Sequence, residues 1–145
     1  KASSCKGFKN YFDEIYDHHF SKIDNNQKVS KPKQVAKLFR DHEIKLLKPL
    51  LEFLRGNSNC RLIGPGDNVL RAPTVAFVPK NKKPSEVARD LSKYNIMSGA
   101  GDFYAVRPLK ALGIDPDEGV VRLSFVHYTS ENEVKRLIEA LEKIL

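Results

Sequence analysis

Apolar side chains recur at helical spacing over the first part of the chain. In Phe8–Phe20 they fall at every third or fourth position, which is typical of one face of an α-helix. A second series of this kind covers Lys33–Leu54, and Gly56 is well suited to end it. Pro49 lies inside this second helix, where it removes a backbone donor and favours a kink. The polar stretch Ser21–Lys33 predicts a loop between the two helices.

The rest of the chain alternates short apolar runs with amphipathic segments. The predicted elements follow the order β, β, α, β, α, β, α. Strands are expected at 61–64, 73–78, 96–97 and 119–126, and helices at 84–94, 103–112 and from Ser130 onward, where Glu133 completes a capping box. Such alternation favours a single sheet with helices on one face. We therefore expect a helical linker segment at residues 1–57 and a small α/β domain at residues 58–145.

The composition limits the class of protein without identifying a function. Among 145 residues, 41% are hydrophobic and 30% are charged, which is typical of a globular domain. No apolar run approaches the roughly 20 residues that a bilayer span needs, so no membrane partner is expected. The net charge of +7 permits either a solvated basic surface or nucleic-acid binding. Because the lysines are scattered and no aromatic platform is interleaved with them, a nucleic-acid partner is not expected.

The two cysteines and four histidines show no pattern of a disulfide framework or a metal site. Cys5 and Cys60 are far apart in sequence and do not form a CxxC motif, which favours a reducing compartment, the cytoplasm. No histidine has a second ligand at metal spacing, so no metal is expected. The chain begins at Lys1 without an initiator methionine or a signal-peptide pattern. We interpret this start as a processed or truncated N-terminus.

One short motif and one arginine are the candidates for chemistry. Gly99–Tyr104 has two glycines between a predicted strand and a predicted helix, but Tyr104 stands where a dinucleotide fingerprint has its third glycine, so that interpretation is weak. Arg122 lies within an otherwise apolar strand, which predicts a central or half-buried position. A guanidinium there needs an anion, because burying an unpaired charge is costly. An internal ion pair and a fork for a substrate carboxylate are equally compatible with the sequence.

Several segments together resemble the C-terminal end of class V aminotransferases, and most closely the cysteine desulfurase-like subgroup. The resemblance covers roughly Leu38 to Leu145. It rests on these segments: Arg71–Phe77, Pro84–Ala88, Gly101–Ala105, Leu112–Ile114, Gly119–Ser124 and His127–Val134. It implies the small domain of a fold type I enzyme that uses pyridoxal phosphate (PLP) and is usually a homodimer. The expected fold is a mostly antiparallel sheet of about four strands.

The resemblance also assigns roles to particular residues. Arg122 corresponds to the arginine that binds the α-carboxylate of an amino-acid substrate. The loop formed by Gly99, Gly101, Asp102, Phe103 and Tyr104 corresponds to the active-site entrance, and His127 is a further candidate site residue. Tyr104 stands where desulfurases have a nucleophilic cysteine, and a phenol cannot replace a thiolate as a sulfur carrier. Ordinary desulfuration through this loop is therefore not expected.

The resemblance places the cofactor lysine in a large PLP-binding domain upstream of this chain. The chain by itself is accordingly expected to contribute no catalytic residue, to bind no PLP covalently and not to catalyse. Two alternatives remain: a free-standing basic α/β module that binds an acidic partner or an anion, and a degenerate homologue without activity. If the large domain is absent, the surface around Phe103, Tyr104 and the first helix is expected to be exposed and to promote self-association.

Overall fold

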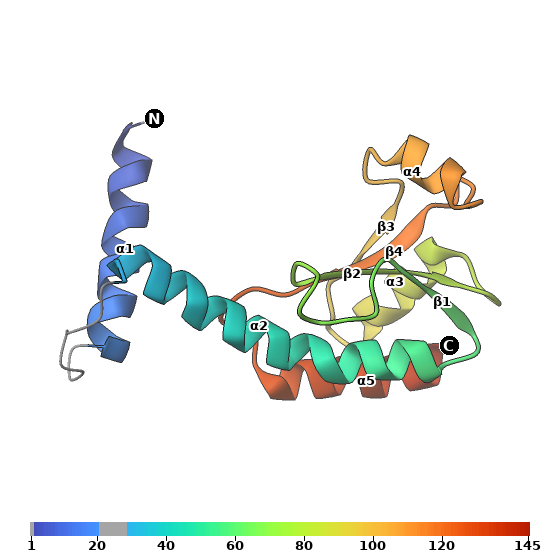
Figure 1. The fold of residues 1–145 in the computed structure, drawn as a ribbon. Coiled ribbons are helices and arrows are strands. Elements are labelled where there is room, and N and C mark those ends of the chain that lie inside the picture. The colour runs from blue at the N-terminus through green and yellow to red at the C-terminus, as the bar shows by residue number, and fades with distance from the viewer. Residues whose placement is uncertain (1, 21–28) are drawn as a thin grey trace. The chain divides into compact units, whose positions relative to one another are not determined.

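The computed structural model describes residues 2–20 and 29–145, and the chain divides between His42 and Glu43 into two compact units (Figure 1). The division falls inside a long helix, so the first unit ends and the second begins on one continuous element. The predicted division between a helical linker segment at residues 1–57 and a small α/β domain at residues 58–145 stays a prediction.

The first unit contains α1 (Ala2–Phe20) and the N-terminal part of α2 (Lys31–Gly56). Tyr16 is buried, and its ring lies 4.6 Å from the Lys31 ammonium. The helix at Phe8–Phe20 is thus confirmed and extends further toward the N-terminus. Positions 21–28 of the predicted loop lie outside the described residues. Helix α2 begins two residues earlier than expected, because a proline such as Pro32 is well tolerated in a first helical turn.

Helix α2 continues through Pro49 and ends at Gly56, the predicted stop. No helix in residues 2–20 or 29–145 combines the length and the apolar composition that crossing a membrane requires.

The second unit is built on a four-stranded antiparallel sheet. Its strands are β1 (Cys60–Ile63), β2 (Thr74–Pro79), β3 (Gly99–Gly101) and β4 (Val120–Ser124), and their order across the sheet is β1-β2-β4-β3. Helices α3 (Pro84–Lys93), α4 (Val106–Ala111) and α5 (Glu131–Ile144) connect or follow them. The predicted order β, β, α, β, α, β, α and the predicted fold class are therefore confirmed.

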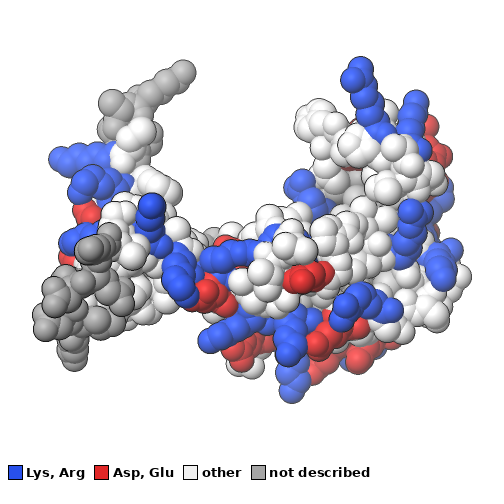
Figure 2. Space-filling view, in the orientation of Figure 1, with Lys and Arg blue, Asp and Glu red and all other residues white. Residues whose placement is uncertain are grey.

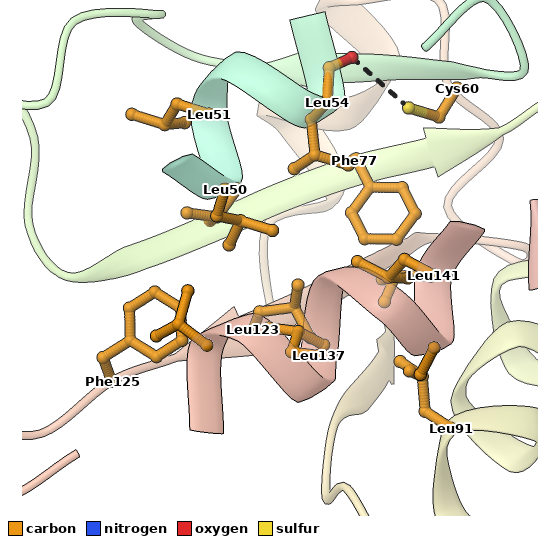
Figure 3. Packing of buried hydrophobic residues seen from close by; sticks show 14 of the residues in the cluster. Leu50, Leu51, Leu54, Cys60, Phe77, Leu91, Leu123, Phe125, Leu137 and Leu141 are labelled. Atoms are coloured by element: carbon orange, nitrogen blue, oxygen red, sulfur yellow. Dashed lines mark hydrogen bonds between the residues drawn. The ribbon is translucent and has the colours of Figure 1, made fainter. Parts of the chain in front are cut away.

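One face of the sheet forms the main core with α2, α3 and α5. Strand residues such as Phe77 and Leu123 pack against leucines of the helices, among them Leu50, Leu137 and Leu141 (Figure 3). Burying each large apolar side chain stabilises the fold by roughly 1.5–3 kcal/mol, before the loss of conformational entropy is counted. This closed face is where most of the stability of the unit is expected to arise.

Helix α5 covers this face and begins with the predicted capping box. Ser130 Oγ accepts a hydrogen bond from the Glu133 backbone N–H at 3.2 Å, and the Ser130 backbone N–H donates to Glu133 Oε2 at 2.7 Å. The cap satisfies donors that the first helical turn would otherwise leave unpaired.

The opposite face is covered only in part. Leu109, Ile114 and Val120 form a small second cluster there, on which Phe103 packs. Because side chains alternate along a strand, β4 directs Val121 into the main core and Val120, Arg122 and Ser124 to this second face. We call the part around Arg122 the open face.

The largest differences from the predicted boundaries lie next to β3. The strand expected at 96–97 is absent; the strand is Gly99–Gly101, and the Met97 side chain is almost fully exposed. Pairing with β4 creates this strand, although its residues have little β-propensity of their own. The helix expected from Phe103 begins at Val106, because Phe103 and Tyr104 adopt left-handed backbone angles.

Candidate functional site

Arg122 occupies the middle of the open face. Its strand is flanked on both sides, and in the register Arg122 stands opposite Ala76 on β2 and Gly99 on β3. The prediction of a central strand is confirmed, whereas the side chain itself is exposed rather than half-buried. Because both cross-strand neighbours are small, the sheet beside the guanidinium carries no bulky side chain at these positions.

The aromatic ring of Phe103 is the main contact of Arg122. The Arg122 Cζ atom lies 3.9 Å from the centre of the ring, within the range of a cation–π interaction. In the described parts of the chain, none of the ion pairs or hydrogen bonds involves the Arg122 guanidinium. The internal ion pair that the sequence allowed is therefore not found in those residues, and the five N–H donors remain available to an anion.

The turn that carries Phe103 is strained. Phe103 and Tyr104 have φ angles of 50° and 61°, in a region that bulky residues rarely adopt. Asp102 holds the turn: its backbone carbonyl accepts from Ala105 N–H at 2.8 Å, and its carboxylate accepts from Tyr104 N–H at 3.3 Å. Such strain costs of the order of 1–3 kcal/mol per residue and is often associated with functional sites.

Two glycines allow the loop to approach the sheet. A Cβ atom on Gly99 would lie 2.9 Å from Cζ of Phe103, so the ring rests directly against the β3 backbone. A Cβ atom on Gly119 would lie 2.2 Å from the carbonyl carbon of Gly101, and Gly119 also has a φ angle of 68°. Gly99, Phe103 and Arg122 thus form one contiguous group, which we call the Arg122 cluster.

The sequence matches a known family over most of its length. The family model described as Aminotransferase class-V matches residues 33–137. The chain belongs to the class V aminotransferase family. The match includes the whole Arg122 cluster, so the cluster is part of the family domain.

Individual relatives of this class V aminotransferase chain agree with the assignment. The curated "Aminotransferase-like protein FGM3" of Gibberella zeae is 32% identical over 117 residues, which are 79% of this chain and 29% of that protein. The apo structure of a cysteine desulfurase from Thermococcus onnurineus is 29% identical, with a TM-score of 0.67, and the match covers 79% of this chain and 28% of that one.

A third relative shows the fold alone. The Escherichia coli cysteine desulfurase CsdA is 22% identical with a TM-score of 0.62, and the match covers 72% of this chain and 25% of that one. The class V aminotransferase chain described here therefore spans less than a third of the length of the relatives it matches.

The other predicted site residues of the class V chain lie at different places. Gly101 and Asp102 lie where β3 passes into the strained turn, next to the Arg122 cluster. Tyr104 at the tip of the turn is fully exposed, at 103% of its reference area. His127 lies beyond the end of β4, half-buried, with its ring 5.2 Å from that of Tyr128. The structure thus places the loop beside Arg122. His127 lies outside the Arg122 cluster.

The two thiols of the class V chain have different surroundings. Cys60 is buried in the main core, where its Sγ donates a weak hydrogen bond to the Leu54 carbonyl at 3.5 Å (Figure 3). Burial raises the pKa of the Cys60 thiol, which disfavours the reactive thiolate. Cys5 is exposed on α1. In the described residues, no group of three or more His, Cys, Asp or Glu side chains is arranged to hold a metal ion.

The sequence analysis missed the positions of Ser124, Thr74 and Gly119 in or beside the open face. Ser124 lies two positions after Arg122 on the same face, and its hydroxyl is 3.4 Å from that of Thr74. Strand alternation would have shown that Ser124 shares the face of Arg122. Gly119 was treated only as the start of a strand, and its contact with Gly101 depends on pairing between distant segments. No local sequence signal could have revealed that contact.

Proposed function

We propose that this chain is the C-terminal small domain of a PLP-dependent enzyme and that Arg122 binds the α-carboxylate of its amino-acid substrate. The observation that carries the proposal is an exposed guanidinium in the middle of a sheet, held by an aromatic ring and paired with no carboxylate in the described residues. A guanidinium can hold a carboxylate through two parallel N–H···O bonds, which also fixes its orientation.

In this proposal the loop Gly99–Tyr104 forms one edge of the substrate site. Its strained turn lies beside Arg122 and exposes Tyr104 fully, so that the loop can contact a substrate or the large domain. The family membership and the length of the relatives support a large domain, an amino-acid substrate and a homodimeric parent enzyme as parts of the same proposal.

The described residues of the open face do not complete a PLP site. The open face presents Arg122, Phe103, Ser124 and Thr74, and this group contains no lysine for a covalent bond to the cofactor. When PLP is bound to its enzyme, it acts as an electron sink for the carbanion chemistry of amino acids. We therefore assign PLP binding to the large domain and carboxylate binding to this chain, which by itself is not expected to catalyse.

The alternative of a basic module for an acidic partner receives less support. Lysine and arginine side chains alternate with aspartate and glutamate over α2 and α5 (Figure 2). Ion pairs such as Lys82–Asp90 and Lys83–Glu118 neutralise part of the basic charge elsewhere in the second unit. Such interspersed charges are typical of a solvated surface. A cytoplasmic location also stays a prediction.

Complementation with a cofactor-binding lobe tests the proposed function. The part of the Gibberella zeae relative that lies outside the matched segment would be mixed with this chain and with PLP, and amino acids would be added while the cofactor absorbance is recorded. We expect an amino-acid-dependent spectral change only when both parts are present. Arg122→Lys should keep cofactor binding but weaken amino-acid binding by roughly 1–3 kcal/mol, since it keeps the charge and loses the fork. Unchanged amino-acid affinity in Arg122→Lys would remove Arg122 from the site.

A further inference from the structure

Arg122 is held by an unusual arrangement of backbone and side chain. Phe103 approaches it from a left-handed turn at the end of β3, and the ring spans from the Gly99 backbone to the guanidinium. Phe103 also packs on the small cluster of Leu109, Ile114 and Val120. The ring is therefore fixed by hydrophobic contacts, whereas the guanidinium is exposed and has no other described partner.

We propose that Phe103 is a positioning residue for Arg122, and that it prepares the guanidinium for a carboxylate before the carboxylate arrives. This inference rests on the proposed function of Arg122. A free arginine side chain loses rotamer freedom when it is fixed. A ring that already restricts the side chain reduces this loss at the moment of binding.

The chemistry of the contact leaves the binding groups of Arg122 free. An aromatic ring supplies no carboxylate or carbonyl oxygen, so the contact with Phe103 pairs none of the five N–H donors of Arg122 with such an acceptor. An acidic partner in place of Phe103 would also hold the arginine, but it would occupy the donors that a substrate carboxylate needs. The aromatic ring thus restrains the cation without competing with the ligand.

The small size of Gly99 allows the Phe103 ring to lie against the β3 backbone. Any side chain at position 99 would begin 2.9 Å from Cζ of Phe103, so it would push the ring away from the sheet. Gly99 has no left-handed backbone angle that would itself require glycine. Its small size therefore matters for the position of the ring. Gly99→Ala displaces the ring without altering either partner of the contact.

Nuclear magnetic resonance of the Arg122 Nε–H group tests the inference on the full 145-residue chain. In the wild type we expect this proton to be shifted upfield by the ring and to respond to sodium acetate more strongly than that of the exposed Arg107, at constant ionic strength. Phe103→Leu and Gly99→Ala should both abolish the upfield shift and weaken the acetate response by roughly two- to five-fold, the scale of an exposed cation–π contact.

A matched control separates positioning from loss of stability. Phe53→Leu changes a half-buried phenylalanine that packs against the main core, and it should leave both the shift and the acetate response of Arg122 unchanged. Replacing Phe103 by 3,5-difluorophenylalanine keeps the shape of the ring and weakens its attraction for a cation. We expect it to retain the upfield shift and to give an intermediate acetate response.

The possible outcomes distinguish the inference from the function on which it rests. If the upfield shift is absent from the wild type, or if the variants lose the shift but bind acetate as the wild type does, Phe103 does not position Arg122, whereas the role of Arg122 stands. If the shift is present but Arg122 responds to acetate no more than Arg107 does, the proposed carboxylate site is wrong, and the inference fails with it.

Discussion

The two faces of the sheet have opposite characters, although the same strands build both. On β4, Val121 and Leu123 point into a core that α2, α3 and α5 close, whereas Arg122 and Ser124 point to the open face. The closed face contains the largest buried side chains of the described residues. The open face combines small residues, strained backbone and an exposed guanidinium. Packing on one side thus provides stability, and the other side exposes polar groups.

The largest expected effect comes from comparing one residue on each face. Phe77→Ala removes a fully buried ring from the closed face and should lower the free energy of unfolding by about 3–5 kcal/mol. Arg122→Ala removes an exposed side chain with one cation–π contact and should cost less than about 1 kcal/mol. Urea denaturation followed by circular dichroism measures both. Similar losses for the two variants would contradict the division of roles between the faces.

A smaller loss of stability is expected for Gly119, which lies against the Gly101 backbone at the end of β3. Gly119→Ala must both adopt a left-handed angle and displace the Gly101 backbone, which together should cost roughly 1–3 kcal/mol or more. Gly113 is the matched control, since its φ angle of 70° is similar but nothing lies within 4 Å of its Cβ position. Gly113→Ala should therefore cost only the backbone strain. Equal losses in thermal unfolding would show that the contact with Gly101 does not matter.

The sequence predicted the closed face better than the open face. The amphipathic pattern predicted the helix that begins at Ser130, because such patterns are local, and Val134, Leu137 and Leu141 of this helix are buried. The short strand Gly99–Gly101 could not be recognised locally, since its hydrogen bonds to β4 define it. Residues 103 and 104 resembled a helix start because nothing in their composition indicates left-handed angles.

The candidate site was predicted from one arginine and one short motif. Arg122 stood out because it interrupts an apolar strand, the glycines of Gly99–Tyr104 marked the loop, and the family resemblance gave both a role. The contact between Phe103 and Arg122 was not predicted, because it depends on the path of the strained turn. Functional groups of this kind depend on tertiary geometry, whereas the core that supports them follows from local patterns.

The capping box of α5 tests how much the N-terminus of this helix contributes to the stability of the closed face. Ser130→Ala removes the acceptor for the Glu133 backbone N–H and should lower the free energy of unfolding by about 0.5–2 kcal/mol. Ser85→Ala is the control, because Ser85 is an exposed serine in the first turn of α3. It should change stability by less than about 0.5 kcal/mol. Chemical denaturation measures the free energy of unfolding of both variants. Equal losses for Ser130→Ala and Ser85→Ala would contradict the capping role of Ser130.

The smallest expected effect is a pH dependence of the free energy of unfolding, caused by Asp90 on α3. Hydrogen bonds from Lys93 at 2.8 Å and Lys82 at 3.0 Å lower the pKa of Asp90 from its ordinary 3.8 to about 2. Asp90 therefore binds a proton more tightly in the unfolded chain than in the folded chain. The stabilisation is therefore complete above pH 3.8 and is lost as the pH falls toward about 2.

The variant Asp90→Asn should remove this part of the acid dependence and leave the rest of the profile intact. We expect its urea midpoint to fall less steeply than that of the wild type in this pH range, and the double variant Lys82→Gln, Lys93→Gln to behave similarly. High salt should shrink the difference, because exposed ion pairs are screened. Parallel profiles for Asp90→Asn and the wild type would contradict a contribution of these two ion pairs to the stability of the folded chain.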